Sequence, residues 1–63
     1  MKREHGPYDI VLLDADGYTV TQHESDTLRQ AKKDAKRLLE YPAHKAEVRN
    51  AQGECLADFF ANV

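Results

Sequence analysis

The sequence predicts an α+β fold in which a four-stranded antiparallel sheet has one helix packed on one face. Two observations predict it: one segment has the periodicity of an amphipathic helix, and a pair of β-forming segments lies on either side of it. Each pair is joined by a similar short turn, so the chain reads as ββαββ. We expect an all-antiparallel strand order of 2-1-3-4, with a right-handed crossover over the sheet.

The length of the chain, 63 residues, allows one domain. We assign residues 7–63 to this domain and expect the charged residues 1–6 to form a flexible N-terminus. A domain this short buries only about 60% of its unfolded surface, so its stability is small unless another interaction adds to it. Oligomerisation is one such interaction.

The helix is predicted over residues 27–41. Thr27 and Gln30 have the spacing of a capping box, in which their side chains bond free N–H groups of the first turn. Pro42 ends the helix because it disfavours helical geometry at the residue before it. The apolar side chains that recur at helical spacing, and so share one side, are Leu28, Ala31, Ala35, Leu38 and Leu39.

The two hairpins share a turn signature, an acidic or amide residue followed by Ala, one variable residue and Gly. Gly17 and Gly53 can adopt the positive φ that closes a type I turn with a bulge. The strands on either side of these turns are predicted over residues 7–13 and 18–24 in the first hairpin, and 44–49 and 54–60 in the second.

The turns predict the register of each hairpin, with Leu12 facing Val20 and Val48 facing Leu56. Side chains alternate between the two faces of a sheet, so this register assigns every strand residue to a face. The face expected against the helix carries Tyr8, Ile10, Leu12, Val20, Val48, Leu56 and Phe60. The opposite face is expected to carry Val11, Leu13, Thr19, Thr21, Cys55, Ala57 and Phe59, together with Lys45, Glu47 and Arg49.

Large apolar residues on the opposite face are unexpected, because a sheet covered by one helix normally shows water a polar second face. If they are exposed together, they form a patch of the kind that marks an interaction site. The interface that this predicts comprises Val11, Leu13, Thr19, Cys55 and Phe59, and a homodimer would cover it. The alternative is that these residues are scattered singly, which is normal for a protein surface.

The polar side of the helix is a continuous basic stripe, formed by Arg29, Lys32, Lys33, Lys36 and Arg37. It holds five of the nine basic residues and one of the eleven acidic residues, so the rest of the chain has a net charge of −6. Such a stripe can bind an anionic partner, either nucleic acid or an acidic protein. It can also be the solvated face of an amphipathic helix, and it lacks the aromatic residues that would stack on bases.

No motif indicates catalysis, a cofactor or a metal site. The first turn resembles the start of a calcium loop, but Ser25 stands where that loop needs a glutamate. His5, His23, His44 and Cys55 lack metal-ligand spacing. One cysteine forms no internal disulfide and suits a reducing, cytoplasmic compartment, and no apolar run is long enough to span a membrane.

The helix opening T-L-x-x-A-K-x-x-A-K and the turn V-R-N-A-x-G-E resemble those of small uncharacterised ββαββ proteins from bacterial and bacteriophage genomes. The resemblance implies a bacterial or phage setting and an accessory or host-modulating role, and it carries over no catalytic residue. From the residues and this resemblance we expect a non-enzymatic protein–protein interaction module. The alternative is a small nucleic-acid-associated protein that uses the basic stripe.

Overall fold

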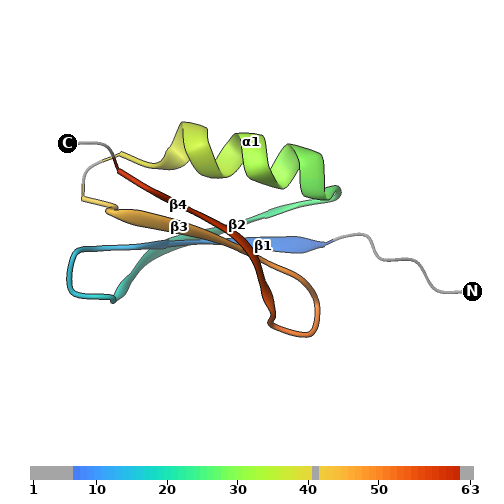
Figure 1. The fold of residues 1–63 in the computed structure, drawn as a ribbon, viewed down its shortest axis with the longest axis horizontal. Helices are drawn as coiled ribbons and strands as arrows, with labels where there is room; N and C mark the ends of the chain where they lie inside the picture. The colour runs from blue at the N-terminus through green and yellow to red at the C-terminus, as the bar shows by residue number, and fades with distance from the viewer. Residues whose placement is uncertain (1–6, 41, 62–63) are drawn as a thin grey trace, which may run out of the picture.

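The computed structural model describes residues 7–40 and 42–61, and it confirms the ββαββ arrangement (Figure 1). Its elements are β1 (Tyr8–Leu13), β2 (Thr19–Ser25), α1 (Leu28–Leu38), β3 (Lys45–Arg49) and β4 (Cys55–Phe60). The strands form one antiparallel sheet in the order β2-β1-β3-β4, as predicted, and α1 lies across one face of it. The segment 1–6, predicted to be flexible, lies outside the described residues.

The helix begins as the sequence predicts and ends earlier. Thr27 caps it by accepting a hydrogen bond from the backbone N–H of Gln30 at 3.1 Å. The Gln30 side chain does not complete the capping box, because it donates to Asp34 instead. The last helical residue is Leu38 rather than residue 41, which is outside the described residues. Leu39 leaves helical geometry so that its side chain packs against the core.

The helix α1 is too short and too highly charged to cross a membrane, and the described residues include no other helix. Its packing against the sheet follows from the apolar side that the sequence predicts.

Both predicted turns form, and they are locally equivalent. Gly17 and Gly53 have φ values of 91° and 87°, and the N–H of each donates to the carbonyl oxygen three residues before it, in Asp14 and Asn50. The N–H groups of Asp14 and Asn50 in turn donate to the carbonyl oxygens four residues later, at 2.9 and 3.0 Å. The pairing that the sequence predicts is therefore correct next to each turn.

Farther from the turns, the predicted register is wrong by one residue. Leu13 pairs with Thr19 but Leu12 pairs with Thr21, so Val20 is an extra residue in β2. The second hairpin repeats this irregularity, with Leu56 as the extra residue in β4. A single extra residue is a β-bulge, and it moves every later side chain of that strand to the other face.

The bulges correct the predicted assignment of faces. Ala57 and Phe59 pack against the helix-side core, whereas the sequence places them on the opposite face. Thr21 pairs with the buried Leu12 and is likewise on the helix side. Three residues predicted to face the helix are instead exposed large hydrophobics outside the core cluster: Val20, Leu56 and Phe60.

The core is small and lies between α1 and the two central strands. Ala31 and Ala35 are fully buried, and their small size lets the helix approach the sheet closely. Ile10 and Val48 are the largest fully buried side chains. The other members of this core are Tyr8, Leu12, Ala43 and Ala46, with Leu28, Leu38, Leu39, Ala57 and Phe59 packed against them.

The two adjacent phenylalanines of β4 test the bulged register. We expect Phe59→Ala to lower the free energy of unfolding by about 1–3 kcal/mol, because it removes a partly buried ring from the core. Phe60→Ala should change it by no more than about 0.5 kcal/mol, because that ring is exposed. Urea unfolding at low protein concentration measures both. A larger loss of stability for Phe60→Ala than for Phe59→Ala would contradict the bulge and support the unbulged register.

Candidate interaction surfaces

The face of the sheet away from α1 is the first candidate surface, and we call it the open face. Cross-strand pairing arranges its residues in three rows that each run from β2 to β4. The first row is Thr19, Leu13, Lys45 and Phe60; the second is Gln22, Val11, Glu47 and Asp58; the third is Glu24, Asp9, Arg49 and Cys55. The face is therefore mixed in character, with apolar residues between charges of both signs.

Four of the five residues predicted as an interface lie on the open face: Val11, Leu13, Thr19 and Cys55. Phe59 does not, because the bulge in β4 turns it toward the helix. Val11 is only 3% exposed, although it lies outside the helix-side core cluster. Leu13 is partly buried, so the large apolar side chain that this face exposes most is Phe60, at 64%.

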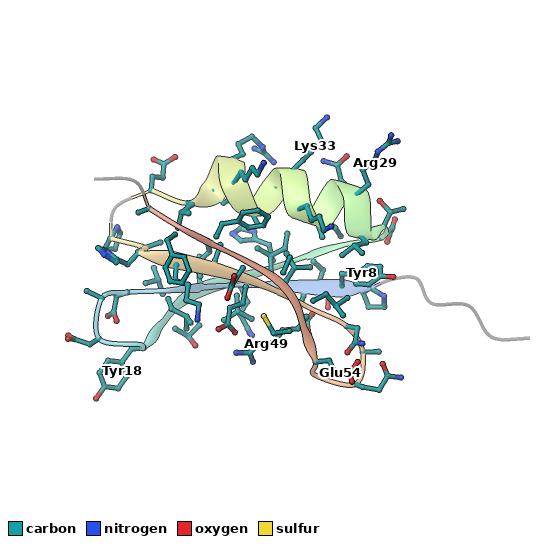
Figure 2. The ribbon with its side chains drawn as sticks, in the orientation of Figure 1. Tyr8, Tyr18, Arg29, Lys33, Arg49 and Glu54 are labelled. Atoms are coloured by element: carbon teal, nitrogen blue, oxygen red, sulfur yellow. The ribbon has the colours of Figure 1, made fainter. Side chains whose placement is uncertain are left out.

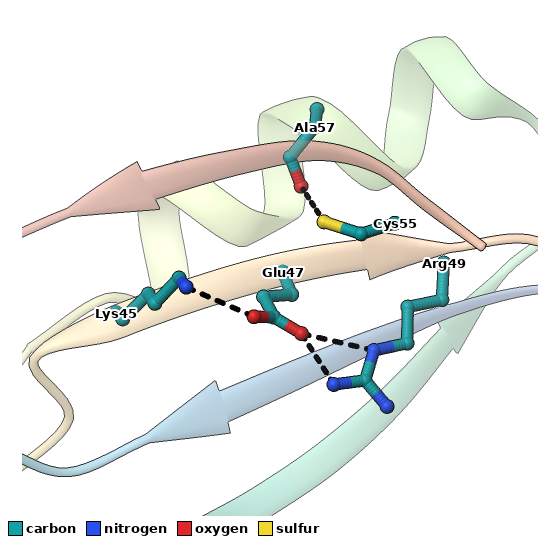
Figure 3. Close-up of polar contacts among 5 residues, drawn as sticks. All are labelled: Lys45, Glu47, Arg49, Cys55 and Ala57. Atoms are coloured by element: carbon teal, nitrogen blue, oxygen red, sulfur yellow. Dashed lines mark hydrogen bonds and ion pairs between the residues drawn. The ribbon is translucent and has the colours of Figure 1, made fainter. Parts of the chain in front are cut away.

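Val11 lies opposite Glu47 of β3, which is held by two cations of its own strand (Figure 3). Lys45 Nζ is 3.0 Å from one oxygen of Glu47, and Arg49 donates from Nε and from a terminal nitrogen to the other. Hydrogen bonds, first from Arg49 and then from Lys45, lower the pKa of Glu47. The hydrogen bond with Glu47 likewise raises the pKa of Lys45. This charged array occupies the middle of the open face.

The basic stripe of α1 is the second candidate surface. All five of its cationic residues are exposed, and Figure 2 shows Arg29 and Lys33 pointing away from the sheet. Arg37 forms an ion pair with Asp34 at 2.9 Å. The other four cations have no acidic partner within residues 7–40 and 42–61.

Asp34 lies on the helix surface, but its carboxylate makes hydrogen bonds that stabilise the fold. Its carboxylate accepts hydrogen bonds from Arg37, Gln30 and the buried Ser25, each at 2.9 Å. The hydrogen bond from Arg37, followed by those from Gln30 and Ser25, lowers its pKa to about 2. Asp34 thus joins the end of β2 to the helix and neutralises only one cation of the stripe.

A groove between α1 and β4, which we call the α1–β4 groove, joins the basic stripe to an aromatic side chain. It has a volume of about 300 Å³ and is lined by Lys32, Lys33, Lys36, Ala57 and Phe59. The ammonium group of Lys36 lies 5.4 Å from the centre of the Phe59 ring. Sequence reasoning missed this meeting of cations and ring, because the unbulged register places Phe59 on the far side of the sheet.

Within residues 7–40 and 42–61, the structure does not gather the histidine, cysteine and acidic side chains considered above into a metal site. Cys55 is exposed, and its thiol lies 3.4 Å from the carbonyl oxygen of Ala57. The carboxylate of Asp14 accepts hydrogen bonds from the backbone N–H groups of Asp16 and Tyr18, and it thereby stabilises the hairpin turn. Within the described part of the chain, no three His, Cys, Asp or Glu side chains gather where they could hold a metal ion. His5 lies outside the described residues.

Comparisons of the chain with protein-family models, with curated proteins and with solved structures gave no match. The geometry and charge of these surfaces are therefore the features that indicate a function.

The hydrogen bonds to Asp34 predict an acid-dependent loss of stability. Because folding lowers this pKa from about 3.9, the ionised group stabilises the fold above that value, and the contribution disappears as the pH falls toward 2. In urea unfolding, the midpoint difference between the wild type and Asp34→Asn should therefore shrink between pH 5 and pH 2. Asp16→Asn, which removes one carboxylate from an exposed turn position, is the matched control. A constant difference for Asp34→Asn would contradict the prediction.

Proposed function

We propose that the protein is a small non-enzymatic protein–protein interaction module that self-associates through the open face of its sheet. The observation that carries this proposal is the exposure of Phe60 on that face, in the same row as Leu13 and Thr19. An exposed aromatic ring is a typical anchor of a protein interface, and Leu13 adds a partly buried apolar side chain to the same row.

The size of the core supports the proposal. Four of the eight members of the core cluster in the described residues are alanines, so one helix and one sheet bury a modest apolar area. Covering the open face would add to this area, and burial of one phenylalanine side chain contributes about 1.5–3 kcal/mol. Self-association can therefore supply stability that a 63-residue chain lacks.

The charges of the open face are compatible with two copies that meet across a two-fold axis. Such an interface uses the same patch twice, so it must be complementary to itself. The face carries the cations Lys45 and Arg49, and it also carries the acidic residues Asp9, Glu24 and Asp58. Two copies can thus place acids of one against bases of the other around Leu13 and Phe60.

The setting that we propose is the cytoplasm of a bacterium or of a phage-infected cell. The resemblance of the helix opening and the second turn to short bacterial and phage proteins supports this setting. The single cysteine agrees with it, because exposed free thiols are typical of reducing compartments.

Association with nucleic acid is the second candidate function. It is favoured by the four stripe cations without an acidic partner in the described chain, three of which line the α1–β4 groove together with Phe59. The net charge of −6 outside the stripe opposes it, because those acids repel a polyanion. Phosphate contacts are strongest at low salt. If the protein does not bind single-stranded DNA under that condition, this candidate function is eliminated.

Analytical ultracentrifugation over a range of concentrations tests self-association. We expect a transition from monomer to dimer, and we expect Phe60→Ser to weaken the dimer by about tenfold or more, because each dimer loses two buried rings. The matched control is Tyr18→Ser, which removes an aromatic side chain that is 72% exposed at the end of the first hairpin (Figure 2).

Maleimide labelling of Cys55 provides a second readout, because this thiol is exposed on the open face of the monomer. Its labelling rate should fall as the dimer forms. A chain that remains monomeric at high micromolar concentration, or a Phe60→Ser variant that dimerises like the wild type, would contradict the proposal.

A further inference from the structure

We propose that the α1–β4 groove binds an acidic, extended segment of a partner protein, which adds as a fifth strand to the edge of β4. This site is separate from the open face, so it does not depend on self-association. Three features of the site support such binding: a free strand edge, a groove beside that edge, and positive charge without an acidic partner in the described residues.

The strand β4 is at one edge of the sheet. It pairs with β3 on one side, and no strand of the described chain pairs with its other side. An edge strand presents N–H and C=O groups that can pair with an extended peptide, and this is a recurrent mode of peptide recognition.

The α1–β4 groove lies beside this edge, on the helix side of the sheet. Its apolar floor is formed by Ala57 and Phe59 of β4, and its wall carries three lysines of α1. An added strand would direct alternate side chains toward this wall, at a repeat of about 7 Å. Lys32 and Lys36 are four residues apart on a helix that runs along the sheet (Figure 1), which spaces them by about 6 Å. Carboxylates at alternate positions of the peptide can therefore reach successive lysines.

The charges at the two edges of the sheet differ. Lys32, Lys33 and Lys36 have no acidic partner in the described residues. At the β2 edge, the surface hollow is lined instead by Asp9, Gln22, His23 and Glu24. An acidic strand is thus attracted to β4 and repelled from β2.

The groove favours a peptide over a nucleic acid. A base can stack on Phe59 only if it displaces the Lys36 ammonium group, which already lies over the ring. The groove also contains one aromatic residue, whereas single-stranded nucleic acids are held by a series of stacking platforms. A short acidic peptide needs no displacement of that cation, and it gains main-chain hydrogen bonds at the strand edge.

Fluorescence anisotropy with the full chain tests the site. The probe is a labelled nine-residue peptide of alternating valine and glutamate, and we expect it to bind more tightly at low salt than at physiological salt. Its glutamine counterpart, with the same length and apolar residues, should bind at least about fivefold more weakly. Two further versions carry backbone N-methyl groups on the odd or on the even residues. At least one should lose binding, because N-methylation removes main-chain donors.

Single substitutions in α1 locate the site. Lys32→Gln and Lys36→Gln should each weaken peptide binding by about twofold to fivefold. Arg29→Gln is the matched control, because it removes one exposed charge from the same helix outside the groove lining, and it should have an effect below about twofold. Circular dichroism verifies that each variant is folded.

Four results would overturn the inference. They are equal binding of the glutamine peptide, undiminished binding of both N-methylated peptides, and equal effects of the groove and control substitutions. The fourth is tighter binding of a single-stranded thymidine oligonucleotide with the same dependence on Lys32 and Lys36, which would assign the groove to nucleic acid.

Discussion

The two β-bulges, at Val20 and Leu56, determine what β2 and β4 present on each face of the sheet. Each adds one residue to the returning strand of a hairpin, and each therefore exchanges the two faces for the rest of that strand. In β4 the exchange sends Phe59 under the helix, where Lys36 meets its ring, and sends Phe60 to the open face, where Lys45 lies over it. Both the open face and the α1–β4 groove depend on this shift.

Much of the fold could be predicted because its signals are local. The Thr27 cap, the alanine and leucine periodicity of the helix, and the glycines of the two turns act within a few residues of where they stand. The bulges have no comparable signal, because Val20 and Leu56 are ordinary strand residues that are as compatible with regular pairing as with a bulge. The end of the helix at Leu38 was also missed, since Leu39 leaves the helix to pack on a core that no local pattern describes.

The candidate surfaces were predicted less completely than the fold, for the same reason. The basic stripe is a property of one helix, so the spacing of Arg29, Lys33 and Lys36 was sufficient to find it. The groove requires β4 to lie beside that helix in a particular register, and the burial of Val11 on the open face depends on neighbours from other strands. Such features arise from tertiary contacts.

The equivalence of the two hairpins has a consequence for how the chain folds. Each hairpin closes through a turn of a few residues, and its bulge and turn bonds recur in the other. The pairing of β1 with β3 is different, because it joins segments separated by the whole of β2 and α1. Closing that long loop is the step with the largest entropy cost, while turns and helix form from local contacts. The pairing of β1 with β3, where Val11 lies opposite Glu47, is therefore the pairing of this sheet that has the highest loop-closure cost.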